Sequence, residues 1–182
     1  MKKTGIVRRI DDLGRVVVPK EIRKTLKIRE GDPLEIFVDQ DKEVILKKYS
    51  PINELGNHAR EYAEALYEST GFISCITDKD TIITVVGTAE KKYKNRPLNQ
   101  ALEKAMEDRK SVLIENPREH PYYRDVEEED IYFAAEAIAP IISQGSIEGA
   151  VLLGTMDKDS APGKVELQMA EFTAGLLAKH LE

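Results

Sequence analysis

Two short β-branched runs separated by an Asp-Asp-Leu-Gly turn constrain the fold of this chain more than any other feature. The runs are residues 6–10 and 16–18, and the turn between them is residues 11–14. Runs of this kind, bounded by Gly, Asp or Pro, are typical of β-strands. Pro19 follows the second run and suits the first position of a helix, because its fixed φ fits there and its missing N–H costs nothing. The sequence therefore predicts a strand–turn–strand unit that passes directly into a helix.

The predicted helix is short and has a basic side. At 100° per residue, Ile22 and Leu26 share one side of it. The residues that share a second side are Lys20, Arg23, Lys24 and Lys27. Further cations stand on the two preceding runs and their turn: Arg8, Arg9 and Arg15. A surface of this composition suits the phosphates of a polyanion.

Charge is divided unevenly along the 182 residues. Residues 1–50 hold 13 Lys and Arg against 9 Asp and Glu, a net charge of +4, and the remainder holds 14 against 24, a net charge of −10. The whole-chain pI of about 5.3 conceals this division. Because acidic surfaces repel polyanions, the asymmetry indicates a polyanion partner for residues 1–50.

Neither membrane insertion nor export is indicated by the sequence. No apolar run reaches the 18 residues of a membrane span, and the first residues lack the apolar core of a signal peptide. The single cysteine, Cys75, cannot form an internal disulfide, which suits a reducing cytoplasm. Since it stands in an apolar run, we expect a buried structural thiol.

The remainder of residues 1–50 predicts a second hairpin. Gly31 is placed to end the helix, residues 34–39 alternate in polarity, and residues 44–47 form the return strand. Below about 70–80 residues a single core rarely supplies more than about 3–5 kcal/mol, and small domains add disulfides, a metal or a partner chain. Residues 1–50 contain no cysteine and no histidine. We therefore expect this region to be a homo-oligomer.

Residues 51–182 predict an α+β domain. Pro51 begins a helix with a seam of mostly apolar residues that step by three and four: Ile52, Leu55, Ala59, Tyr62, Leu66 and Ser69. The segments that follow are a hairpin (72–77 and 81–86), a helix (98–106), a strand (111–115), a surface loop (116–130), two strands (131–142 and 147–156) and a helix (163–181). The last helix carries a similar seam, so we expect the two terminal helices to pack together and offer a surface for self-association.

Residues 4–19, TGIVRRIDDLGRVVVP, together with residues 21–26 and 34–38, resemble the AbrB-type swapped-hairpin DNA-binding family. The resemblance covers residues 1–50 and implies a mainly β, dimeric domain that binds double-stranded DNA and swaps hairpins between two chains. It implies DNA contacts for Arg8, Arg9, Arg15 and Arg23. Lys24 stands where relatives commonly carry arginine. Because lysine lacks the planar fork of arginine, we expect Lys24 to contact phosphate.

Residues 51–182 resemble GAF-like domains in the order of their elements. This implies a regulatory and oligomerisation domain, a tetramer formed through the terminal helices, and a small effector whose contacts the sequence does not name. The complete chain resembles sporulation regulators of endospore-forming bacteria. That resemblance implies a cytoplasmic, nucleoid-associated transcription factor that activates and represses sporulation genes.

Two alternatives stay open. An antitoxin is the first, because toxin-neutralising proteins use the same type of DNA-binding domain, although they usually append a disordered tail. A sensor enzyme built on the GAF-like domain is the second. We predict no enzyme, because GAF-like sulfoxide reductases need several cysteines and the chain has one, and because no Ser/His/Asp spacing or Gly-rich phosphate loop is present.

The acidic and histidine residues predict no metal ion and no cofactor. Asp11 and Asp12 suit the shaping of a turn through side-chain to backbone bonds. We expect His58 and His180 to lie on the polar faces of separate helices. One loop group lacks the spacing of metal ligands and suggests a solvated loop: His120, Glu127, Glu128, Glu129 and Asp130.

Overall fold

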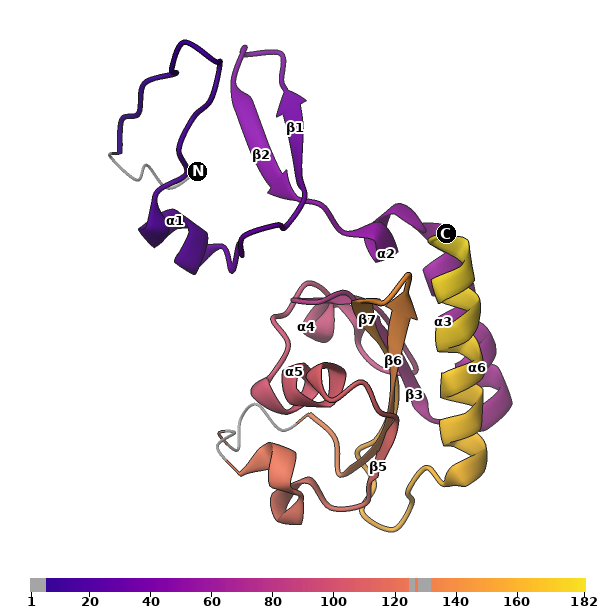
Figure 1. The fold of residues 1–182 in the computed structure, drawn as a ribbon. Helices are drawn as coiled ribbons and strands as arrows, with labels where there is room; N and C mark the ends of the chain where they lie inside the picture. Colours follow the sequence, from indigo (N-terminus) through magenta and orange to yellow (C-terminus); the bar gives the residue numbers. More distant parts are fainter. Residues whose placement is uncertain (1–5, 125–126, 128–131) are drawn as a thin grey trace. The chain divides into compact units, whose positions relative to one another are not determined.

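The computed structural model describes residues 6–124, 127 and 132–182. It divides the chain into two units, an N-terminal unit of residues 1–49 and a C-terminal unit of residues 50–182 (Figure 1). No helix among the described residues is long and apolar enough to cross a bilayer.

From residue 6 onward, where the structure describes it, the N-terminal unit contains one helix and one hairpin. Helix α1 spans Lys20–Thr25, and strands β1 (Leu34–Val38) and β2 (Val44–Lys48) pair antiparallel, with Ile36 opposite Leu46. The hairpin predicted over residues 34–47 is confirmed.

The predicted first hairpin takes a different form. Residues 6–10 and 16–18 are extended but form no strand ladder with each other. The backbone bonds that the structure records between them lie at the turn, where the Asp11 N–H donates to the Arg15 carbonyl and the Gly14 N–H to the Asp11 carbonyl, both at 3.0 Å. The prediction of two strands is wrong for the single chain, because neither run pairs with a strand among the described residues.

Helix α1 is shorter than its sequence pattern. Pro19 precedes the helix, and its carbonyl accepts the first helical bond from the Arg23 N–H at 3.0 Å. Lys27 has a φ of +51° and lies beyond the end of the helix, so the prediction that it shares the basic side of α1 is wrong. Gly31, with a φ of +88°, lies in the following turn and does not end the helix.

The C-terminal unit is built on a five-stranded antiparallel sheet of order β4-β3-β7-β6-β5. Its strands are β3 (Ile73–Thr77), β4 (Ile82–Val86), β5 (Val112–Ile114), β6 (Ala135–Ser143) and β7 (Ser146–Thr155). All five overlap the segments predicted to be strands, residues 72–77, 81–86, 111–115, 131–142 and 147–156.

Helices cover both faces of this sheet (Figure 1). On one face lie α3 (Asn57–Thr70) and α6 (Lys164–His180), with α2 (Pro51–Glu54) ahead of α3; on the other lie α4 (Glu90–Tyr93) and α5 (Gln100–Glu107). The helix predicted from residue 51 to 69 is broken at Gly56, whose φ of +49° no helix accommodates. Helix α4 was not predicted.

The predicted surface loop, residues 116–130, holds structure of its own. Two 3-10 turns, η1 (Pro117–Glu119) and η2 (Pro121–Tyr123), follow β5, and both Pro117 and Tyr123 are buried.

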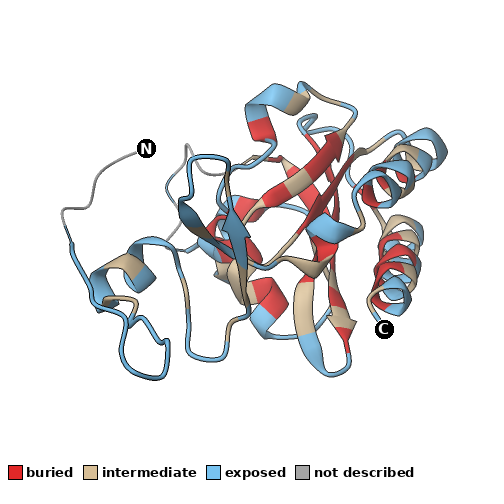
Figure 2. Ribbon diagram, turned by 90° about the horizontal axis from the view of Figure 1, so that it is seen from above, coloured by how far each residue is buried: buried red, intermediate tan, exposed pale blue. Residues whose placement is uncertain are grey.

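Two apolar cores lie on the two faces of the sheet. The core between the sheet and helices α3 and α6 includes Ile76, Leu153 and Leu177, and the core between the sheet and α5 includes Leu102 and Ile138. Figure 2 shows the buried positions concentrated on the sheet and on the inner sides of its helices, whereas the N-terminal unit is largely exposed.

Candidate nucleic-acid interface

The turn that joins the two extended runs is organised by the side chain of Asp11. Its Oδ1 accepts hydrogen bonds from the backbone N–H groups of Leu13 and Arg15, at 3.0 and 2.8 Å. Its Oδ2 accepts one from Nε of Arg15 at 2.8 Å. The bonds from Arg15, the backbone N–H first and the side chain second, hold the pKa of Asp11 below its usual range. Asp11 therefore shapes the turn, as predicted.

The same contacts set the direction of Arg15. Its ion pair with Asp11 leaves 69% of the arginine side chain exposed. Exposed ion pairs contribute little to stability. A phosphate can therefore replace Asp11 as the partner of this guanidinium at small cost.

The five predicted DNA contacts all lie on the surface of the N-terminal unit. Arg8 and Arg9 are on the first extended run, and Arg15 follows the turn. Arg23 and Lys24 are in the last turn of α1, where cations also complement the helix dipole. All five side chains are exposed, so each can reach a ligand without rearrangement of a core.

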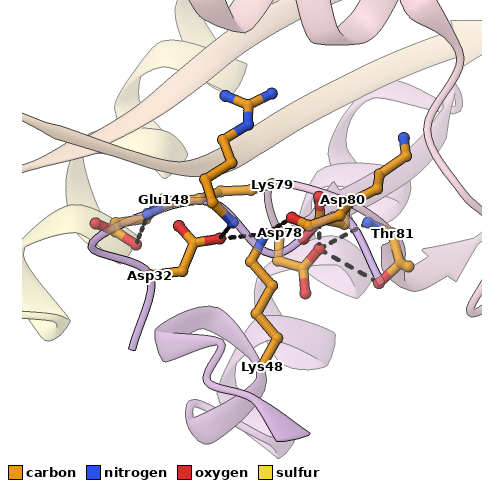
Figure 3. A network of polar contacts seen from close by, with 9 residues as sticks. Asp32, Lys48, Asp78, Lys79, Asp80, Thr81 and Glu148 are labelled. Atoms are coloured by element: carbon orange, nitrogen blue, oxygen red, sulfur yellow. Dashed lines mark hydrogen bonds and ion pairs between the residues drawn. The ribbon is translucent and has the colours of Figure 1, made fainter. Parts of the chain in front are cut away.

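An ion pair and hydrogen bonds hold the base of the β1–β2 hairpin. Nζ of Lys48 lies 3.2 Å from Oδ2 of Asp32 and donates to the Lys27 carbonyl at 3.2 Å. The same Asp32 oxygen accepts the Arg29 N–H at 2.8 Å (Figure 3). Lys48 thus connects the end of β2 to the exit of α1. No sequence pattern indicates this role of Lys48, since its partners lie 16 and 21 residues away.

The N-terminal unit leaves an unusual share of its apolar side chains exposed. On one side of the hairpin, the pairs Ile36–Leu46 and Val38–Val44 are exposed, Val38 by 72%. On the extended runs, Val7 is 86% exposed. Exposed apolar surface on this scale marks an association surface, which agrees with the expectation of a homo-oligomer.

A second apolar surface lies on the C-terminal unit, in a groove of about 430 Å³ between α3 and α6. Met169 and Leu176 line it, and Phe172 stands at it with 69% of its surface exposed. The groove is lined by the predicted seam of α6, which is Val165, Met169, Phe172 and Leu176, and by Tyr62, Leu66 and Ser69 of the seam predicted from residue 51. Two members of the earlier seam, Ile52 and Ala59, instead point into the core and are fully buried.

The two histidines expected on separate polar faces are neighbours at the ends of α3 and α6. Oη of Tyr62 lies 2.8 Å from Nε2 of His180. The His58 ring stacks on that of His180 with centroids 6.1 Å apart. The two residues lie on separate helices and are exposed, as predicted, but the sequence did not indicate that packing of α3 against α6 brings them together.

The structure offers no metal centre within its described residues, since no three His, Cys, Asp or Glu side chains gather there in a suitable arrangement. Of the loop group, Glu128, Glu129 and Asp130 lie outside those residues. Cys75 is buried, and burial raises the pKa of its thiol, which disfavours the reactive thiolate.

Comparison with known proteins relates both units to transcription regulators. The chain is 50% identical to stage V sporulation protein T of Bacillus subtilis over 182 residues, which cover 100% of this chain and 99% of that protein. A family model described as "Stage V sporulation protein T C-terminal, transcription factor" matches residues 54–182. The GAF domain of an Acinetobacter phosphoenolpyruvate-protein phosphotransferase shares the fold of the C-terminal unit, with a TM-score of 0.54 and 10% identity over 74% of this chain and 84% of that one.

The N-terminal unit has relatives of its own. It is 65% identical over 51 residues to the transition state regulatory protein AbrB of Bacillus subtilis, a match that covers 28% of this chain and 52% of that protein. A family model described as "Antidote-toxin recognition MazE, bacterial antitoxin" matches residues 7–54. The chain belongs to the stage V sporulation protein T family of transcription factors, with an AbrB-like N-terminal domain followed by a GAF-like α+β domain.

Proposed function

We propose that this transcription factor activates some sporulation genes and represses others by binding duplex DNA through paired N-terminal units. The observation that carries the proposal is the exposure of five cations on a unit of net charge +4, attached to a remainder of net charge −10. Lys and Arg bound to phosphate supply most of the affinity of such complexes. The N-terminal unit is the part of the chain whose charge favours DNA.

The arginines and Lys24 are suited to different contacts with DNA. Arg8, Arg9, Arg15 and Arg23 present planar forks, each of which can add about 1–3 kcal/mol of discrimination where it meets a guanine edge. Lys24 acts as a point charge on phosphate. Two such units related by a two-fold axis favour DNA sites with the same symmetry.

Two features of the single chain, unpaired strand-forming segments and exposed apolar side chains, support pairing of the N-terminal units. Residues 6–10 and 16–18 have strand-forming sequences without a ladder, and the hairpin has an uncovered apolar side. Exchange of these segments between two chains satisfies both needs, because it supplies backbone partners and buries apolar surface together. We assign residues 1–50 to the DNA-binding domain and residues 51–182 to the GAF-like domain.

The C-terminal unit joins two such dimers and regulates them. Its α3–α6 groove, with Phe172 exposed beside it, is the surface that a second copy covers in a tetramer. Two DNA-binding pairs on one scaffold raise the apparent affinity through effective concentration. We assign this unit to effector sensing without catalysis, and the whole protein to the cytoplasm, at the nucleoid.

Substitution of the arginines tests the DNA-binding surface. In fluorescence anisotropy with a duplex that the wild-type protein selects from a randomised pool, Arg15→Ala and Arg23→Ala should each weaken binding about 5- to 160-fold, which corresponds to a loss of roughly 1–3 kcal/mol. Lys42→Gln, an exposed change in the β1–β2 loop, is the control and should leave affinity within two-fold. Unchanged affinity in both arginine variants, with unchanged thermal unfolding, would show that DNA binds elsewhere.

An antitoxin is the second candidate, favoured by the match of residues 7–54 to an antitoxin model. Antitoxins neutralise toxins with a tail that folds on its target. Limited proteolysis separates the two functions. A protease-resistant fragment beginning near residue 50 supports the regulator, and complete degradation of residues 50–182 supports the antitoxin.

A further inference from the structure

Glu136 is the buried ionisable group that DNA binding does not explain. It lies on β6 with 1% of its surface exposed, in register between Ile114 of β5 and Gly154 of β7. The hydroxyl of Tyr123, which is 5% exposed, donates a hydrogen bond to Oε1 of Glu136. This pair lies in the apolar core beneath α5, where a charge has little solvation.

Tyr123 belongs to the short turn η2, which a second tyrosine also anchors. The hydroxyl of Tyr122 donates to Oδ2 of Asp108, the residue that ends α5. Asn99, the residue that caps the start of α5, hydrogen-bonds to the Tyr123 side chain. Two successive tyrosines therefore attach the segment 117–124 both to α5 and to the sheet.

We propose that the Tyr123–Glu136 pair is a proton-operated latch: with Glu136 protonated the η2 turn stays seated on the sheet, and ionisation of Glu136 favours its release. Release admits water to the carboxylate, whose ionised form needs more donors than the one phenol provides. This latch is a property of the C-terminal unit and does not depend on DNA binding.

The latch is sensitive to pH because burial disfavours the ionised form of Glu136. Burial raises the pKa of Glu136 from 4.5 to about 7, and the hydrogen bond from Tyr123 opposes this in part. No cation among the described residues offsets the burial. The closed state therefore holds a proton on Glu136 that the open state gives up between pH 4.5 and 7.

Of the titratable groups that face the pair, His120 acts on the turn with the opposite sign. Burial and the charge of Glu136 raise the pKa of Tyr123, and burial raises that of Cys75 on β3. Tyr132, on the segment before β6, contributes to the raised pKa of Tyr123. His120 caps η2 by accepting the Tyr122 N–H on Nδ1, and burial lowers its pKa. Protonation of His120 would loosen the turn as pH falls, whereas the latch loosens as pH rises.

Hydrogen exchange of the full-length protein tests the latch. The measurement is the opening equilibrium of the peptide 117–124 at pH 5.5 and 8.5, corrected for intrinsic exchange rates, with α6 as the reference for global unfolding. A shift of the Glu136 pKa from 4.5 to about 7 predicts roughly 30-fold more opening at pH 8.5. An opening ratio within two-fold of unity overturns the proposal.

Variants assign the effect to this pair. Glu136→Gln keeps the shape and an acceptor for Tyr123 but cannot ionise, so its ratio should fall to about one; a ratio equal to that of the wild type overturns the latch. His120→Asn removes the competing titration and should leave the ratio at least as large. If Glu136→Gln does not fold, Tyr123→Phe decides, because it should increase opening at both pH values, and unchanged opening contradicts the proposal. Tyr122→Phe, which leaves Glu136 paired, should preserve the pH ratio.

Discussion

The carboxylate of Asp11 holds Arg15 at two points, its backbone N–H and its side-chain Nε, each at 2.8 Å. One residue thus folds the turn and aims a cation that we assign to DNA. The backbone bond belongs to Oδ1 and the side-chain bond to Oδ2, so the two roles can be separated by substitution.

Asp11→Asn should keep the turn and lose the ion pair, because its Oδ1 can still accept the backbone N–H groups. We expect unfolding temperatures close to the wild type and DNA affinity equal or higher, since one anion leaves the surface. Asp11→Ala removes both roles and should lower the unfolding temperature and the affinity together. Calorimetry and anisotropy measure the two quantities. Equal effects of Asn and Ala would show that the backbone bonds do not matter.

Acid should stabilise the C-terminal unit through Glu136. Because the folded-state pKa, about 7, exceeds the ordinary value of 4.5, the favourable contribution is fully present below pH 4.5 and is lost as pH rises to 7. Glu136→Gln should remove this part of the pH dependence. Urea unfolding of both proteins at pH 5, 6 and 7, at one protein concentration, measures it. Parallel pH profiles for the two proteins would contradict the assignment.

Phe172→Ser should dissociate tetramers into dimers and leave the fold intact. The side chain is 69% exposed beside the α3–α6 groove, so its loss removes interface area without opening a core. Native mass spectrometry gives the chain number directly. Glu171→Gln, an exposed neighbour outside the lining of the groove, should retain the wild-type number, and a tetrameric Phe172→Ser would place the interface elsewhere.

Substitution by alanine should have opposite effects on stability at Gly149 and at Gly175. A Cβ at Gly149 would lie 1.9 Å from the Thr77 carbonyl oxygen, so Gly149→Ala must shift backbone and should destabilise by about 1–3 kcal/mol or more. A Cβ at Gly175, on the exposed side of α6, meets nothing within 4 Å. Gly175→Ala should stabilise by about 0.5–1 kcal/mol, because alanine favours helix. Denaturant unfolding at equal concentration compares them, and destabilisation by both would contradict the packing described.

Much of the C-terminal unit could be predicted from periodicity. The strands β3, β4, β6 and β7 are apolar runs bounded by turn residues, as suits a sheet with a core on both faces, and the three-and-four spacing of α6 marks a helix with one apolar side. The break at Gly56 could not be predicted, since glycine permits a positive φ without requiring it. Nor could the burial of Tyr123, whose partner Glu136 follows a loop.

In the N-terminal unit, the local features could be predicted from the sequence but the strand pairing could not. Its cations and its Asp11 turn were evident, because turn chemistry and charge are local properties of the sequence. The strands predicted at residues 6–10 and 16–18 were not found, because strand formation needs a partner and the single chain provides none. The proximity of His58 and His180 was missed for a related reason: 122 residues separate positions that only tertiary packing brings together.

The salt dependence of DNA binding tests the central proposal most directly. Each phosphate neutralised contributes about −0.9 to the slope of log affinity against log salt, and five cations from each of two chains offer up to about ten. We predict a slope steeper than roughly −4 for the wild type, made shallower by about two in Lys24→Ala, which removes one phosphate contact from each chain of a pair. A slope near zero, or one that is unchanged in Lys24→Ala, Arg15→Ala and Arg23→Ala alike, would contradict the assignment of DNA binding to these side chains.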